Sequence, residues 1–193
     1  MLPVTVHTSI SAPREEIFDF LTDLANRTAW WDHFTSSLRL AHPKSDGVGA
    51  AIRYQLDAPG NTQWVESQIV EADRPRRVVE TTRGGRLSKT RGEVVYELSR
   101  AGRGLTRVEM TIWNEGGTPR ERFKEKLGTR PWMRRQAKVA LERLRTIFEE
   151  MPDAPLARAT VAGWEPQKAA RFGVGPGPQP RVHTGSGRRA SSG

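Results

Sequence analysis

The chain has 193 residues, no cysteine and a formal net charge of +9, from 31 Lys and Arg against 22 Asp and Glu. Without cysteine, disulfides, thiolate catalysis and cysteine-based metal sites are excluded. The first residues show neither the basic nor the apolar region of a signal peptide, and no run approaches the roughly 18 apolar residues of a membrane span, so we expect a cytoplasmic protein.

The first elements expected along the chain are a strand and an amphipathic helix. Residues 4–10 alternate with the two-residue period of a half-buried strand. A helix is expected to begin near Pro13 and to end near Asn26. Its apolar stripe consists of Ile17, Phe18, Leu21 and Leu24. A second, short helical turn then carries the aromatic residues Trp30, Trp31 and Phe34.

Strand-like segments follow, and turn sequences rich in Gly, Pro, Asn or Asp separate most of them. These segments span residues 36–42, 50–56, 62–72, 76–82, 87–99 and 104–114. Their even spacing and short turns predict an antiparallel meander, in which one face of the sheet is polar and the other is packed.

From Thr118 onward the period of the apolar residues changes from two to about 3.6. Residues 118–127 form a candidate short helix, and a longer helix is expected from 131 to about 150. Its apolar stripe consists of Met133, Ala137, Ala140, Leu144 and Ile147. We expect residues 1–150 to form one domain and residues 151–193 to be a largely disordered, basic tail rich in Gly, Pro and Ser, because the tail lacks apolar periodicity.

Four segments of this chain resemble the START/Bet v 1-like (SRPBCC) superfamily, in its bacterial polyketide cyclase/dehydrase or lipid-transport-like branch. They are SISAPREEIFDFLTDLANRTAWW, IVEADRPRRVVETT, LTRVEMTI and RPWMRRQAKVALERLRTIFEE. The resemblance covers about residues 3–150. It implies an α+β helix-grip fold, in which a curved antiparallel sheet of about six to seven strands wraps around a long C-terminal helix, with two short helices after the first strand. A shared fold of this kind does not specify a function.

The sequence and the resemblance together predict a hydrophobic cavity between the sheet and the C-terminal helix. Strand parity places alternate residues of three strands on one face, with Tyr54 and Tyr96 as polar handles. We expect a carrier or sensor that binds a hydrophobic or amphipathic small molecule there, without a cofactor and without catalytic residues. The candidate ligand-binding residues are Trp30, Trp31, Phe34, Ile52, Tyr54, Val94, Tyr96, Met110, Ile112, Met133 and Ala137. The alternative is a filled core that the two adjacent tryptophans close at one end.

A cofactor-independent enzyme of the polyketide cyclase/aromatase or dehydratase type is a second candidate. It would need an inward carboxylate or phenol with a shifted pKa. Strand alternation places the side chains of Glu97 and Glu109 on the face opposite the apolar residues. It does not assign Glu66 and Glu80 to either face. The four histidines show no metal-ligand spacing, so no metal is expected.

The third candidate is an interaction module that binds RNA or an anionic membrane through its basic surface. Three regions carry the basic residues: a hairpin tip, the first half of the last helix, and the tail. They are Arg83, Arg86, Lys89 and Arg91; Arg130, Arg134, Arg135 and Lys138; and Arg181, Arg188 and Arg189. We expect at most a weak contact through the basic tail and no stable partner. Ser191 in the tail resembles a kinase site.

Overall fold

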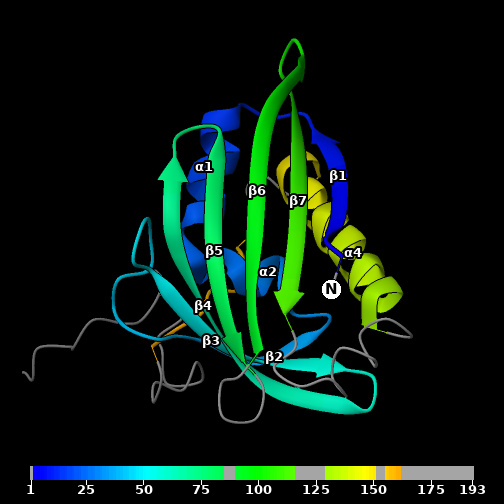
Figure 1. Cartoon of the computed structure of the whole chain (residues 1–193). Coiled ribbons are helices and arrows are strands. Elements are labelled where there is room, and N and C mark those ends of the chain that lie inside the picture. The colour runs from blue at the N-terminus through cyan, green and yellow to red at the C-terminus, as the bar shows by residue number, and fades with distance from the viewer. Residues whose placement is uncertain (1, 85–89, 116–128, 151–154, 162–193) are drawn as a thin grey trace, which may run out of the picture. The chain divides into compact units, whose positions relative to one another are not determined.

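The computed structural model describes residues 2–84, 90–115, 129–150 and 155–161. Within these ranges the strands form one antiparallel sheet in the order β1-β7-β6-β5-β4-β3-β2, which curls around the helices (Figure 1). The strands are β1 Val4–Ile10, β2 Thr35–Leu40, β3 Ala51–Ala58, β4 Asn61–Asp73, β5 Arg77–Gly84, β6 Thr90–Gly102 and β7 Leu105–Glu115. The expected helix-grip α+β fold is confirmed, with α4, Arg130–Glu149, as the long C-terminal helix.

The segment between β1 and β2 contains three short helical elements, namely α1 Arg14–Thr22, the 3-10 helix η1 Leu24–Arg27 and α2 Thr28–Trp31. The expectation that the first helix ends near Asn26 is wrong, because the chain leaves the helix at Asp23. This residue has extended backbone angles, and its carboxylate accepts a hydrogen bond from the N–H of Ala25 at 3.2 Å. An aspartate in this position caps a new helical turn. All four residues of η1 are buried, including Arg27.

The core lies between the inner face of the sheet and α4. The predicted stripe of α4 is buried, and so are the predicted inner faces of β3, β6 and β7. In the register of β6 and β7, Tyr96 lies opposite Met110, and Glu97 lies opposite Glu109 on the outer face. Strand parity therefore predicted these faces correctly.

A segment that follows α4 in the chain packs against the edge of the sheet. The N–H of Leu40 in β2 donates to the carbonyl oxygen of Thr160 at 2.7 Å, and the N–H of Ala159 donates to that of Ala25 in η1, also at 2.7 Å. Because β2 is the last strand in the sheet order, residues 155–161 run along its free side.

A charged side chain fixes the same segment to η1. The guanidinium of Arg158 donates to Oδ1 of Asn26 and to Oδ2 of Asp23, at 2.6 Å each. Structure therefore extends past residue 150 in the described part of the tail. The short helix expected over 118–127 and the tail from 162 onward lie outside the described residues, so the domain boundary stays a prediction.

Gly92, on the inner face of β6, has no room for a side chain. A Cβ atom there would lie 2.1 Å from Oδ1 of Asn114, 2.6 Å from Oγ1 of Thr82 and 2.7 Å from the carbonyl oxygen of Trp113. Because the last atom is backbone, the clash is not relieved by side-chain rotation. We expect Gly92→Ala to lower the free energy of unfolding by about 1 to 3 kcal/mol, as overpacking does elsewhere. Urea denaturation measures this change.

Gly102, in the same strand, provides the matched control. The nearest atom to a Cβ at Gly102 is 3.8 Å away, which is an ordinary contact distance. Gly102→Ala should therefore change the free energy of unfolding by less than about 0.5 kcal/mol. Equal losses in the two variants would contradict the steric explanation.

Candidate functional site

The interior of the helix-grip fold contains a buried ion pair. Arg27 of η1 and Glu80 of β5 are 1% and 0% exposed, and Nη2 of Arg27 donates to Oε1 of Glu80. The other oxygen of Glu80 accepts a hydrogen bond from the Ser67 hydroxyl of β4 at 2.7 Å. Nη1 of Arg27 donates to the Tyr96 hydroxyl of β6 at 2.8 Å. Both charges are thus paired and hydrogen-bonded, as burial requires.

Aromatic rings surround the guanidinium of Arg27. Its central carbon lies 4.6 Å from the ring centre of Trp31, 4.9 Å from that of Trp30 and 5.6 Å from that of Tyr96. The two tryptophans contact each other edge to face at 5.7 Å, and Trp31 contacts Tyr54 in the same way at 5.9 Å. Cation–π attraction adds to the ion pair in holding Arg27. Both tryptophan side chains are buried.

The ionisation states at this site follow from burial and from the two charges. Burial alone would lower the pKa of Arg27, but the adjacent carboxylate of Glu80, together with Tyr96 and Tyr54, outweighs burial and raises this pKa above its ordinary value. Burial raises the pKa of Tyr54 and of Tyr96, and the charge of Glu80 acts in the same direction. Arg27 therefore stays cationic, and both tyrosines stay neutral phenols, at any physiological pH.

One hydrogen-bond donor beside the ion pair lacks a partner. Nε1 of Trp31 is buried and makes no hydrogen bond. Leaving a buried donor unsatisfied costs about 1 to 3 kcal/mol. An acceptor atom placed against this N–H would remove that cost.

The predicted ligand-binding residues all lie in one hydrophobic core. They are Trp30, Trp31, Phe34, Ile52, Tyr54, Val94, Tyr96, Met110, Ile112, Met133 and Ala137. The structure brings the aromatic members together around Arg27, with the ring of Phe34 5.1 Å from that of Trp31. The aliphatic members lie on the inner faces of β3, β6, β7 and α4. Their contact with a ligand stays a prediction.

Sequence reasoning missed Arg27 and Ser67 and left Glu80 unplaced. One pattern could have identified Arg27, because Trp30 and Trp31 follow it by three and four residues and such spacing places side chains on one helical face. No comparable pattern was available for Ser67. Of the two unplaced carboxylates, Glu66 is exposed and Glu80 is buried.

His33 lies at the edge of the aromatic cluster, in surroundings that lower its pKa. Its Nε2 donates to the carbonyl oxygen of Gln136 in α4 at 3.1 Å, and its ring lies 4.7 Å from that of Phe34. Burial lowers the pKa of His33, and the positive charge of Arg143 acts in the same direction. Together they outweigh the hydrogen bond and the charge of Asp32, which favour the protonated ring.

The free energy of unfolding should therefore fall as the pH drops below about 6.5, the ordinary histidine pKa, since the unfolded chain then binds the proton more tightly than the folded one. The loss ends once the pH is below the lowered pKa of the folded protein. His33→Gln, which keeps a donor for the Gln136 carbonyl, should flatten this decline in urea denaturation measured at a series of pH values. An unchanged slope would contradict the assignment.

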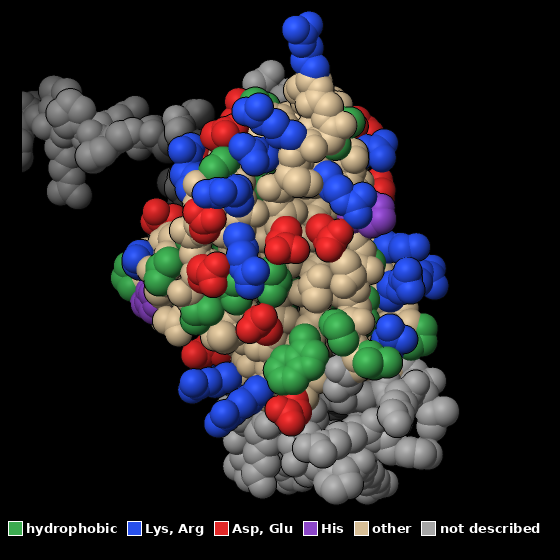
Figure 2. All heavy atoms as spheres, turned by 45° about the horizontal axis from the view of Figure 1, so that its top comes forward, with side chains coloured by type: hydrophobic (Ala, Val, Ile, Leu, Met, Phe, Trp, Pro, Cys, Tyr) green, Lys and Arg blue, Asp and Glu red, His purple; other side chains and the backbone are tan. Residues whose placement is uncertain are grey.

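An open surface hollow of about 600 Å³ lies at the ends of β5, β6 and β7. Side chains of both charges line it, and Figure 2 shows Lys and Arg interspersed with Asp and Glu on this face. Arg77 alone forms ion pairs with Glu71 at 3.1 Å and with Glu97 at 3.7 Å. Five arginines and three carboxylates line the hollow, so ion pairing neutralises only part of its positive charge.

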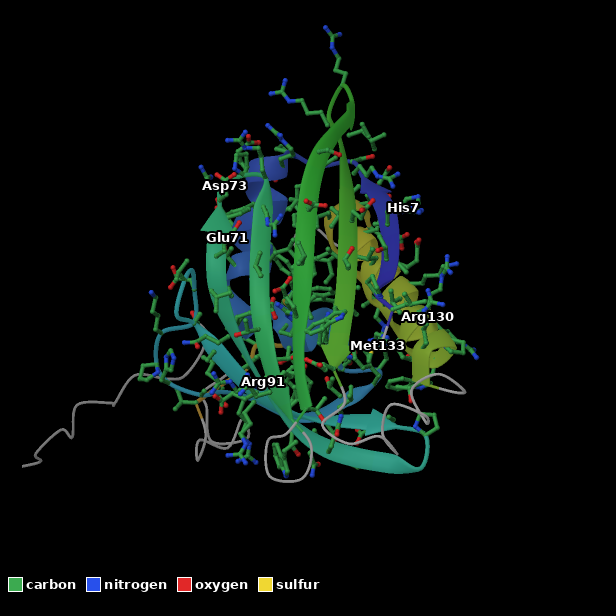
Figure 3. The ribbon with its side chains drawn as sticks, viewed as in Figure 1. His7, Glu71, Asp73, Arg91, Arg130 and Met133 are labelled. Atoms are coloured by element: carbon green, nitrogen blue, oxygen red, sulfur yellow. The ribbon has the colours of Figure 1, made fainter. Side chains whose placement is uncertain are left out.

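Those predicted basic residues that the structure describes do not form one patch. Arg91 on β6 and Arg130 on α4 are well separated in Figure 3. Arg134, Arg135 and Lys138 are exposed on α4. The remaining predicted basic groups, apart from Arg83 on β5, lie outside the described residues, as does Ser191. In the described ranges, no helix is long and apolar enough to cross a membrane, and no cluster of three or more His, Asp or Glu side chains is placed to hold a metal ion.

Comparisons with known proteins agree with this fold. Residues 1–149 match the protein family described as polyketide cyclase / dehydrase and lipid transport. The solution structure of the KanY protein aligns with a TM-score of 0.62 at 18% identity, over 77% of this chain and 97% of that one. No curated protein matches the chain.

Two crystal structures give similar values. The ginseng major latex-like protein 151 from Panax ginseng aligns with a TM-score of 0.59 at 12% identity, over 76% of this chain and 97% of that one. Protein TTHA0849 from Thermus thermophilus aligns with a TM-score of 0.57 at 18% identity, over 74% of this chain and 94% of that one. At such identities the likeness establishes the fold alone.

Proposed function

Because the chain belongs to the polyketide cyclase/dehydrase and lipid-transport family, we propose that it binds a hydrophobic or amphipathic small molecule inside the grip, as a carrier or sensor. The buried pair of Arg27 and Glu80 supports this proposal most directly. Apolar residues of similar volume are often as stabilising as a buried ion pair, or more so. We therefore assign the pair of Arg27 and Glu80 a role other than stabilising the fold, namely to bind the polar part of the ligand.

In this proposal the surrounding residues supply two kinds of contact with the ligand. The inner faces of β3, β6 and β7 and the buried stripe of α4 supply apolar walls for the body of the ligand. Arg27, Trp31, Tyr54 and Tyr96 supply donors that orient its polar group. A mostly apolar lining with a few placed polar groups is the usual composition of a small-molecule site.

Native mass spectrometry of the freshly purified protein, followed by solvent extraction, tests the proposal. We expect a discrete adduct that weakens in Tyr54→Phe and Tyr96→Phe, because each variant removes one hydroxyl and keeps the ring. Trp113→Phe, on the outer face of the sheet, should retain the adduct and serves as control. A clean apo mass, together with no uptake from a panel of lipids, quinones and polyphenols, would overturn the proposal.

An enzyme of the cyclase type is the second candidate, and one observation favours it. Glu80 is an inward carboxylate, which is the feature such an enzyme requires. Its oxygens are already held by Arg27 and Ser67, so it would stabilise developing positive charge more readily than it would deliver a proton. Chemical change of the extracted adduct on incubation with protein, lost in Glu80→Gln while binding persists, would support catalysis.

A further inference from the structure

We infer that the interior site accepts a neutral ligand through an acceptor oxygen, such as the carbonyl of a ketone, ester or quinone, rather than a carboxylate, a phosphate or an ammonium group. This inference rests on the proposed function. It follows from the charges and the unused hydrogen-bonding groups around Arg27, each of which comes from the described residues.

The charges at the site already sum to zero. The ionisable groups that act on Arg27 are Glu80, Tyr96 and Tyr54. Glu80 supplies one negative charge in direct contact, and both tyrosines are neutral phenols. Every one of these side chains is buried, so solvent does not screen an added charge as it does at a surface.

The unused hydrogen-bonding groups at the site are donors. Trp31 has an unpaired N–H, and the neutral phenol of Tyr54 carries a hydroxyl proton. The Tyr96 hydroxyl accepts from Arg27 and keeps its own proton to donate. Each oxygen of Glu80 already has a partner. The site is therefore neutral and rich in donors.

A carbonyl oxygen complements this arrangement, whereas charged groups do not. A carboxylate or phosphate would leave a net negative charge in the interior, because Glu80 already neutralises Arg27. An ammonium group would leave a net positive charge and would meet donors instead of acceptors. An uncompensated buried charge is far costlier than a buried carbonyl that receives hydrogen bonds. Aromatic walls at Trp30 and Trp31 suit an apolar ligand body next to that oxygen.

Four ligands with the same ring system test the inference, namely acetylnaphthalene, naphthoate, naphthylmethylamine and ethylnaphthalene, all substituted at one ring position. Their dissociation constants are measured at neutral pH by titration calorimetry. We expect acetylnaphthalene to bind about tenfold or more tighter than naphthoate and the amine, and about fivefold tighter than ethylnaphthalene, which lacks an acceptor.

The outcomes separate the inference from the proposed function. Binding without preference, or tighter binding of naphthoate, would overturn the inference and leave the proposed function standing. If none of the four ligands and no member of the lipid, quinone and polyphenol panel binds, both fail. The wild-type series decides the matter even if a variant does not fold.

Two variants sharpen the test. Glu80→Gln leaves the charge of Arg27 uncompensated, so the preference should shift from acetylnaphthalene to naphthoate. Trp31→Phe keeps an aromatic ring and removes the N–H, so it should lower the affinity for acetylnaphthalene more than the affinity for ethylnaphthalene. An unchanged order of preference in a folded Glu80→Gln variant would contradict the charge argument.

Discussion

Replacing Glu80 with glutamine is expected to lower the free energy of unfolding by about 3 to 5 kcal/mol, because Arg27 would keep its charge in the interior without a carboxylate beside it. The pair is almost completely inaccessible to solvent, so no water compensates the loss. Replacing Arg27 with methionine should cost a similar amount, since Glu80 would then be the uncompensated charge. Urea denaturation monitored by tryptophan fluorescence and by circular dichroism measures both variants.

The double variant Arg27→Met with Glu80→Leu is the control for this prediction. It removes both charges and fills the volume with apolar atoms, and such replacements are often neutral or stabilising. We expect the double variant to be more stable than either single variant and to bind acetylnaphthalene less tightly than the wild type. Additive losses in the double variant would show that packing, and not charge, makes these residues important.

Trp30→Ala is expected to lower the free energy of unfolding by about 3 to 5 kcal/mol, as truncation of a buried aromatic side chain does. The Trp30 ring is 1% exposed and lies against Trp31, Tyr96 and the guanidinium of Arg27. Its removal would leave a cavity beside the ion pair and delete one cation–π contact. The midpoint and slope of urea denaturation report the change.

Trp113→Ala is the matched comparison, because Trp113 is the same residue type at the outer face of β7 and is 39% exposed. We expect it to cost less than about 1 kcal/mol. If the two alanine variants lose equal stability, Trp30 does not have the central packing role that the structure gives it. A loss in Trp30→Ala that shrinks when Arg27 is also replaced would measure their coupling.

The fold was predictable because periodicity alone determines which residues face inward. Alternation along β3, β6 and β7 predicted inner faces that are buried, and the helical stripe beginning at Met133 predicted the buried side of α4. The end of the first helix at Asp23 was harder to predict from the sequence. The apolar spacing of Phe18, Leu21 and Leu24 continues across it as if the helix were unbroken, while the cap depends on one side-chain hydrogen bond.

The site was only partly predictable, and Glu80 shows why. Two adjacent valines precede it, and both are buried, Val78 at 0% and Val79 at 5% exposure. If alternation along the strand is counted from Val79 as an inward residue, Glu80 faces outward. If it is counted from Val78, Glu80 faces inward. Its partner Arg27 lies on a different element far away in the sequence. Only the folded chain shows that the two charges meet.

The segment 155–161 was also beyond sequence reasoning, because main-chain hydrogen bonds and a single arginine, Arg158, attach it, and these leave no periodic trace in side-chain type. Its position along β2 has a practical consequence. An uncovered outer strand offers its free N–H and C=O groups to a second molecule and promotes aggregation. A version of the protein shortened to the region of family similarity would expose Leu40 in this way and would be prone to associate through β2. The residues after α4 thus protect part of the outer edge of β2.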